Sequence, residues 1–205
     1  MPRPRLTAPG IVLLALVAGF GLLGAWTWIN GPPPKLLRLL MTTRTGDRVA
    51  QDLLRVTAPA APHGVRVLGP GDALPPWVLP DASGRAQPLA QWKGKTLLLS
   101  FWASWCVPCL KEMPALAAAQ RAHAGHGVQV VGIAMDNPAA VREYLDLHPP
   151  GYPMLLGDTT RPDPRVVLGD TRRALPFSVL VGKDGRIRHT RLGALDAATL
   201  DRWLR

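Results

Sequence analysis

Cysteine is the scarcest reactive side chain in this sequence, because the 205 residues contain only two, Cys106 and Cys109. A framework of several structural disulfides is therefore excluded, although a low cysteine count does not by itself identify a cellular compartment. The two cysteines are separated by only two residues, so the thiol chemistry of the chain is confined to one short segment.

Acidic residues are also few. Asp and Glu number 14 against 24 Lys and Arg, which gives a formal net charge of +10 at pH 7. About half of the basic excess precedes Trp77, and the densest basic run after it is Arg172-Arg173. Such scattered charge is typical of a solvated surface and excludes the continuous basic stripe of a nucleic-acid-binding protein. The N-terminal share of the excess suits the neighbourhood of an anionic membrane.

Uncharged runs long enough to cross a membrane are absent except for one, which includes Ile11 to Ile29. At about 1.5 Å per residue this run would span roughly 28 Å as a helix, close to the thickness of a bilayer's hydrocarbon core. Trp26 and Trp28 stand near its end, where interfacial aromatic residues are common. We therefore expect residues 1–31 to form an N-terminal transmembrane helix. A cleaved signal peptide is the alternative, but cleavage near Gly19-Phe20-Gly21 would leave an apolar N-terminus.

Residues 32–72 have the composition of an insert followed by a linker. Three consecutive prolines, Pro32 to Pro34, interrupt any helix and form a stiff spacer. Apolar residues between positions 35 and 56 are spaced for one or two amphipathic helices, which either lie on anionic lipid or pack on the following domain. Residues 57–72 are rich in proline and glycine, as linkers are. We expect the remaining residues, 73–205, to form the main folded domain.

The two cysteines lie where an apolar strand is predicted to meet a helix. Residues 96–102 have the short apolar composition of a buried strand, and residues 107–122 carry apolar side chains at helical spacing. Cys106 is therefore expected at a helix N-terminus, where unpaired N–H groups and the helix dipole favour a thiolate. This placement is typical of a redox-active Cys-x-x-Cys pair.

Two alternative uses of the cysteine pair can be compared with redox chemistry. A structural disulfide between them would close so small a loop that it restrains little chain entropy. A zinc site would also need His123 and His126, but a helix over residues 107–122 separates the two pairs by about 20 Å. That separation is too large for one shared ion.

Two segments resemble a known family. Residues 101–114, FWASWCVPCLKEMP, and residues 175–187, LPFSVLVGKDGRI, are similar to the active-site and cis-proline segments of membrane-anchored thiol–disulfide oxidoreductases. These are the thioredoxin-like proteins of the TlpA, ResA and cytochrome-c-maturation group. The resemblance covers about residues 70–205 and implies a thioredoxin-like α/β fold, in which a mixed sheet is flanked by helices.

The sequence predicts the elements of that fold separately, from apolar runs, turn residues and caps. Strands are expected at 128–134, 177–181 and 186–191, a short extended piece at 152–156, and a small hairpin around the turn 81–84. Helices are expected at 138–147, capped by Asn137, and from Asp196 to Leu204. Their alternation is that of an α/β domain.

The resemblance also assigns roles to four residues. Cys106 is the attacking thiolate, and Cys109 resolves the mixed disulfide. Pro176 follows a cis peptide bond beside the pair, the alternative being an ordinary trans proline at a strand start. Glu112 exchanges a proton with Cys109, with which it shares a helix face, the alternative being a surface carboxylate. Trp102 and Trp105 are expected to pack around the site.

The implied function is reduction of disulfides in exported client proteins, for example during apocytochrome or oxidase assembly. A membrane thiol–disulfide donor would recharge the pair, and the domain would face the periplasm or outside of a bacterial cytoplasmic membrane. Basic residues on both sides of the uncharged run do not fix this orientation, so it follows from the family. No cofactor, metal or nucleic acid is expected. The alternative is a copper-handling assembly factor that uses the dithiol as a soft ligand pair.

Overall fold

The computed structural model describes residues 43–157 and 162–205. The chain divides between Leu54 and Arg55 into two units, which are considered separately. The predicted membrane anchor, residues 1–31, lies outside the described residues. Within the part of the chain that is described, no helix is long and apolar enough to cross a membrane.

The N-terminal unit contributes one described helix, α3, Arg44–Val56, whose last two residues belong to the second unit. The Thr43 hydroxyl accepts a hydrogen bond from the Gly46 N–H at 3.2 Å, which caps the first turn. This helix lies within residues 35–56, where the sequence predicts one or two amphipathic helices. Residues 35–42 of that segment lie outside the described residues.

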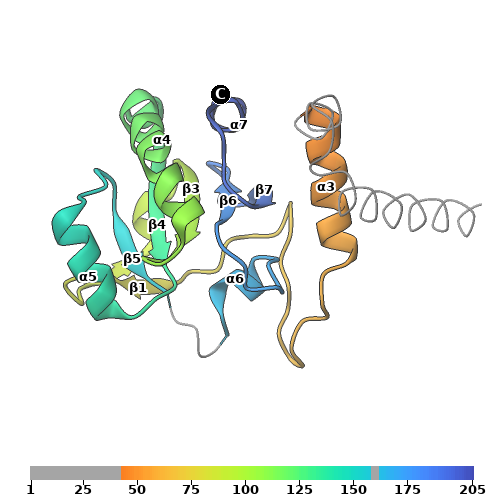
Figure 1. Cartoon of the computed structure of the whole chain (residues 1–205), viewed down its shortest axis with the longest axis horizontal. Helices are drawn as coiled ribbons and strands as arrows, with labels where there is room; N and C mark the ends of the chain where they lie inside the picture. The colour runs from red at the N-terminus through yellow and green to blue at the C-terminus, as the bar shows by residue number, and fades with distance from the viewer. Residues whose placement is uncertain (1–42, 158–161) are drawn as a thin grey trace, which may run out of the picture. The chain divides into compact units, whose positions relative to one another are not determined.

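The second unit is built on a five-stranded sheet with the order β5-β4-β3-β6-β7 (Figure 1). Its strands are β3 Thr96–Trp102, β4 Val128–Ala134, β5 Met154–Leu156, β6 Phe177–Val181 and β7 Ile187–Leu192. Strand β3 runs parallel to β4, and β4 parallel to β5, whereas β6 is antiparallel to both β3 and β7. The sheet is therefore mixed, as predicted.

Strand β3 is the centre of the sheet, and its apolar sequence explains why. Six of its seven residues are buried, because the strand is covered on both faces. Leu98 and Trp102 point into the apolar cluster that includes Cys106 and Cys109, while Leu97, Leu99 and Phe101 point into the opposite cluster. The strand ends at Trp102, so the chain leaves the sheet four residues before Cys106.

The helices complete the two faces. Helices α4 Val107–His123, α5 Pro138–Leu147 and α7 Ala197–Leu204 contribute to the cluster that contains the cysteines. The opposite face is covered by residues of the 68–92 segment, including the 3-10 helix Leu89–Trp92, and by the chain around the one-turn helix α6 Pro164–Val167. The predicted caps are confirmed, since Asn137 accepts from the Ala139 N–H and Asp196 from the Thr199 N–H.

The chain of the second unit is attached to helix α6 and to strand β7 before the predicted domain start at residue 73. The Leu68 N–H donates to the Val167 carbonyl, and the Gly71 N–H donates to the Ile187 carbonyl. A small hairpin follows, with β1 Val78–Pro80 and β2 Ala86–Pro88 paired antiparallel, which confirms the predicted turn between them. The architecture is the thioredoxin-like α/β fold, with the cysteine segment at one end of the central strand.

Candidate active site

Cys106 and Cys109 form a disulfide across the first turn of α4, with Cα atoms 5.3 Å apart. Cys106 is the N-cap residue, and its carbonyl accepts the first helical hydrogen bond, from the Leu110 N–H at 3.1 Å. Pro108 occupies the first turn, where the missing N–H costs no helical bond. Cys106 therefore lies at a helix N-terminus, as the sequence predicted, and this is a position that favours a thiolate. In the described residues no group of three or more His, Cys, Asp and Glu could hold a metal ion.

The loop before Cys106 is held by Asp136, which lies two residues after the end of β4. Its carboxylate accepts hydrogen bonds from the backbone N–H and the hydroxyl of Ser104, and from the Asn137 N–H. Burial alone would raise the pKa of the Asp136 carboxyl, but these hydrogen bonds and one from Trp105 hold that pKa below its ordinary value. An ionised carboxylate thus anchors the loop that presents the attacking sulfur.

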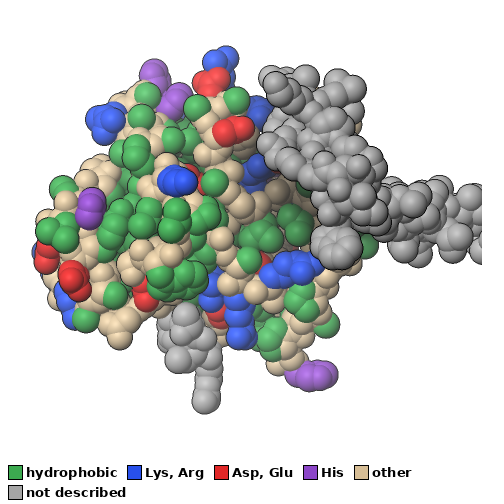
Figure 2. All heavy atoms as spheres, viewed as in Figure 1, with side chains coloured by type: hydrophobic (Ala, Val, Ile, Leu, Met, Phe, Trp, Pro, Cys, Tyr) green, Lys and Arg blue, Asp and Glu red, His purple; other side chains and the backbone are tan. Residues whose placement is uncertain are grey.

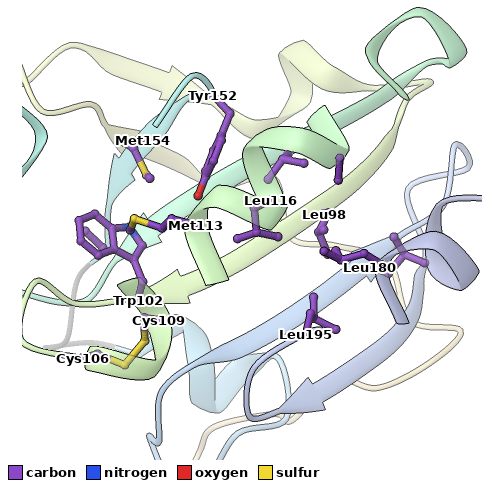
Figure 3. Packing of buried hydrophobic residues seen from close by; sticks show 14 of the residues in the cluster. Leu98, Trp102, Cys106, Cys109, Met113, Leu116, Tyr152, Met154, Leu180 and Leu195 are labelled. Carbon is purple, nitrogen blue, oxygen red and sulfur yellow. A yellow bond between two sulfur atoms is a disulfide. The ribbon is translucent and has the colours of Figure 1, made fainter. Parts of the chain in front are cut away.

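Trp102 and Trp105 have different roles. Trp102 is 1% exposed and packs near Met113 and Met154 in the cluster beside the disulfide (Figure 3). Trp105 is 68% exposed, so the prediction that it packs around the site is wrong. The tight turn from Ala103 to Cys106 and the bond to Asp136 turn its ring outward. Together with Val107, which is 58% exposed, it gives the site an apolar rim.

Glu112 is buried behind the disulfide, with 3% of its surface exposed. Its Oε2 accepts a hydrogen bond from the Leu195 N–H at 3.0 Å, and its Oε1 has no hydrogen-bond partner among the described residues. Burial raises the pKa of the carboxyl to about 7, against the lowering effects of the Leu195 N–H, the Arg191 charge and the Ser100 hydroxyl. The alternative prediction of a surface carboxylate is therefore wrong. The buried group can exist in both protonation states near neutral pH.

Pro176 lies at the same end of the sheet as the cysteines. The Leu175–Pro176 peptide bond is cis, as predicted. Strand β6 begins at the next residue, and Phe177 pairs with Phe101 near the end of β3. The Pro176 carbonyl accepts from the Gly193 N–H at 2.8 Å, which ties the proline to the segment that leads to Leu195 and Glu112. The fold thus places the cis-proline segment and the cysteine segment at the same end of the sheet.

The sequence did not single out Asp136, Ser100 or Ser178. Asp136 could have been found as a carboxylate directly beyond the carboxyl end of a parallel strand, beside the strand that leads to Cys106. Ser100 and Ser178 are lone hydroxyls within otherwise apolar strands, and the register pairs them with each other. Only the strand order, which local patterns do not contain, reveals these relationships.

The fold and the site together define a class. A Cys-x-x-Cys pair at the N-terminus of α4, next to a cis-proline at the end of the central strands, is the redox centre of a thioredoxin-like thiol–disulfide oxidoreductase. Residues 70–190 match the model of the AhpC/TSA family, and the chain belongs to that family.

A curated relative and two solved structures are similar to this chain. The chain is 30% identical over 125 residues to thiol-disulfide oxidoreductase ResA of Bacillus subtilis (strain 168), which covers 60% of this chain and 68% of ResA. The solved structure of a thiol:disulfide interchange protein DsbE from Chlorobium tepidum has a TM-score of 0.58 and 26% identity, covering 65% of this chain and 94% of that one. A thioredoxin from Neisseria meningitidis has a TM-score of 0.53 and 28% identity, with 62% and 84% covered. The chain is a thiol–disulfide oxidoreductase.

Proposed function

We propose that this oxidoreductase reduces disulfides of exported client proteins, such as those in apocytochrome or oxidase assembly, from the outer face of a bacterial cytoplasmic membrane. The observation that carries the proposal is the convergence of the Cys106–Cys109 pair, the cis-bonded Pro176 and the buried Glu112 at one end of the sheet. A membrane thiol–disulfide donor regenerates the dithiol after each turnover.

In the first step, the Cys106 thiolate attacks one sulfur of the client disulfide. A bond forms between Cys106 and that sulfur, and the other client sulfur leaves as a thiolate. The position of Cys106 at the helix N-terminus favours this residue as the nucleophile. Both cysteines are buried in the disulfide form, so their exposure does not separate them. Cys109 lies inside the first turn of α4, whereas Cys106 caps the helix, which makes Cys109 the poorer candidate for the first attack.

In the second step, Cys109 gives its proton to the Glu112 carboxylate and attacks the sulfur of Cys106. The Cys106–Cys109 disulfide forms, and the client sulfur leaves with the electron pair of the broken bond, so the client gains two electrons in total. Glu112 lies three residues after Cys109, on the same face of α4. A carboxyl with a pKa of about 7 is suited to accept this proton at neutral pH.

A protein client is favoured over a small disulfide by the surface around the site. Hydrophobic side chains gather over the region of α4 in the space-filling view (Figure 2), and Trp105 and Val107 are among the exposed large hydrophobic residues. An apolar rim beside a reactive group is suited to an extended client chain.

The membrane location rests on the uncharged run from Ile11 to Ile29 and on the stiff proline segment that follows it. An anchor of this kind would keep the reductase beside both its electron donor and its newly exported clients. Lipid is therefore a proposed partner through the N-terminal span.

The order of the two cysteines can be tested by trapping. Cys109→Ala in the full-length chain should accumulate mixed disulfides with client proteins, because Cys106 can attack and nothing resolves the product. Cys106→Ala is the matched control and should trap few or none. The complexes are counted on non-reducing gels and released with dithiothreitol. Equal trapping by the two variants would show that the roles are reversed or that capture is unspecific.

A further inference from the structure

Two serines interrupt the central strands of the sheet at the same level. Ser100 lies in β3 and Ser178 in β6, and the antiparallel register makes them direct partners. Every other residue of β6 is apolar, and Ser100 is the only polar residue of β3 after Thr96. Both serines are buried, and Ser178 is completely inaccessible. A hydroxyl in such a place requires a physical reason.

The two hydroxyls face α4, the helix that carries the cysteines. Side chains alternate along a strand, so Ser100 shares its face with Leu98, and Ser178 shares its face with Leu180. Leu98 and Leu180 lie below α4 in the cluster that also contains Cys109 and Leu195 (Figure 3). Leu195 is the residue whose N–H binds Glu112. The serine pair therefore lies on the same face of the sheet as α4 and Glu112.

Two buried oxygen atoms on this side have no hydrogen-bond partner among the described residues, namely Oε1 of Glu112 and Oγ of Ser178. The Ser100 hydroxyl is near enough to the carboxyl to lower its pKa. An isolated apolar core would not retain two such atoms together, because each unpaired polar group costs free energy. Ser178 is the cross-strand partner of Ser100, so its hydroxyl lies beside the one that acts on the carboxyl. This arrangement points to a hydroxyl pair that turns towards the carboxylate when it carries charge.

The remaining polar neighbours of Glu112 do not replace the serines. Arg191 of β7 lowers the pKa of Glu112 through its charge, and Cys109 is its neighbour on α4. Burial and then the Glu112 charge raise the pKa of the Tyr152 hydroxyl, which disfavours a second anion at that position. Asp196 follows Leu195, but its carboxylate caps α7 through the Thr199 N–H.

We propose that Ser100 and Ser178 are positioning residues for proton transfer at Glu112. Their hydroxyls stabilise the ionised carboxylate and so keep it able to accept the Cys109 proton. A serine hydroxyl rotates freely and both donates and accepts, so the same pair can accommodate the carboxyl after it has taken that proton. The inference rests on the proposed function, because it concerns the resolution step, but its first test does not depend on activity.

The first test is the titration of the Glu112 carboxyl in the oxidised full-length chain, followed by carbon NMR in detergent micelles. Ser100→Ala with Ser178→Ala should raise the midpoint by about one pH unit, because the charged form loses its hydroxyl donors. Thr171→Val is the matched control, since it removes another buried hydroxyl that has no partner in the described structure. Ser178→Thr, which keeps the hydroxyl, should titrate like the unchanged protein.

The second test separates the two chemical steps with the aromatic disulfide dithiobis(nitrobenzoate). The reduced chain releases one nitrothiobenzoate when Cys106 attacks and a second when Cys109 resolves the mixed disulfide. At pH 7 the double serine variant should resolve about fivefold more slowly, because a midpoint one unit higher leaves about one carboxyl in ten ionised instead of half. The rate should recover near pH 9, and the first phase should stay within about twofold.

The outcomes separate this inference from the proposed function. An unchanged titration midpoint in the double serine variant, or an equal shift in Thr171→Val, would overturn the serine assignment. A shifted midpoint without slower resolution would also overturn it as a role in the reaction. If Glu112→Gln resolves as fast as the unchanged chain, the proton-transfer role of Glu112 fails, whatever the titration shows. If the unchanged chain releases no nitrothiobenzoate, the proposed function itself fails.

Discussion

At the scale of single residues, Glu112 is where burial and charge oppose each other most directly. Its carboxyl is 3% exposed, and its Oε2 accepts a hydrogen bond from the Leu195 N–H. Burial raises its pKa from the ordinary 4.5 to about 7. The folded chain therefore binds this proton more tightly than the unfolded chain does. The corresponding stability is fully present below pH 4.5 and is lost as the pH rises through about 7.

Glu112→Gln should accordingly stabilise the oxidised chain at pH 8, by at most about 3 kcal/mol, because the buried charge is removed. The gain should shrink towards pH 4.5, where the glutamate is protonated in the folded chain and about half protonated in the unfolded chain. Urea denaturation of the two proteins at both pH values measures it. Asp184→Asn, at an exposed carboxylate, is the control and should show no comparable gain. A glutamine variant that is less stable at pH 8 than at pH 4.5, relative to the unchanged chain, would contradict the assignment.

The residues that sequence analysis could find are those whose chemistry is local. Cys106 and Cys109 identify themselves by spacing, and Glu112 by its place one helical turn after Cys109. Pro176 came from resemblance to a family segment, and its cis bond is confirmed. The place of Asp136 just beyond a strand was visible in the sequence, but its contact with Ser104 was not, because that contact joins positions 32 residues apart. The degree of burial of Glu112 depends on Leu195, which is 83 residues away.

At the scale of elements, the short helix α6 and the loop after it are organised by buried charge. The Asp163 carboxylate caps α6 and accepts two hydrogen bonds from the Arg165 guanidinium, at 3.1 and 2.7 Å. The guanidinium also donates to the Arg173 carbonyl at 2.8 Å, and Arg173 has a left-handed φ of 55°. The loop from Leu168 to Leu175 is thereby fixed immediately before Pro176.

Arg165→Ala should therefore destabilise the chain by about 3–5 kcal/mol, because it leaves the Asp163 charge buried without its close partner. Arg188→Ala is the matched control. Its partner Asp184 is also 2.7 Å away, but the two side chains are 54% and 45% exposed, so the expected loss is about 0–1 kcal/mol. Denaturant melts of the oxidised proteins measure both values. Equal losses would mean that the buried pair has no special role in this loop.

The elements themselves were largely predictable, because apolar runs and caps determine them locally. Predicted strands 96–102, 128–134 and 177–181 agree with β3, β4 and β6 to the residue. The chain from 157 to 175 was not predicted in detail, since α6 is a single turn, too short to show a helical period, and a buried ion pair helps to hold it. Trp105 was misplaced for a related reason: an aromatic ring suggests packing, but a turn bonded to a distant carboxylate directs this one outward.

At the scale of the whole molecule, the proposed topology can be tested directly. We expect the full-length chain to remain in the membrane fraction, with residues 35–205 outside the cytoplasm, because the run from Ile11 to Ile29 is long enough to span a bilayer. Reporters fused after Arg205 measure this: alkaline phosphatase, which needs export, should be active, and green fluorescent protein exported by the same route should be dark. The reverse pattern would contradict the topology, and a mature N-terminus near Leu22 would contradict the anchor.

The disulfide between Cys106 and Cys109 uses every cysteine in the chain. When cells are quenched with a bulky maleimide reagent, each molecule therefore takes up two labels if its cysteines are reduced and none if they are oxidised. Two bands on a denaturing gel would then report the supply of reducing equivalents to this compartment, without any engineered probe. A species that carries one label would report the fraction of molecules in a mixed disulfide with a client.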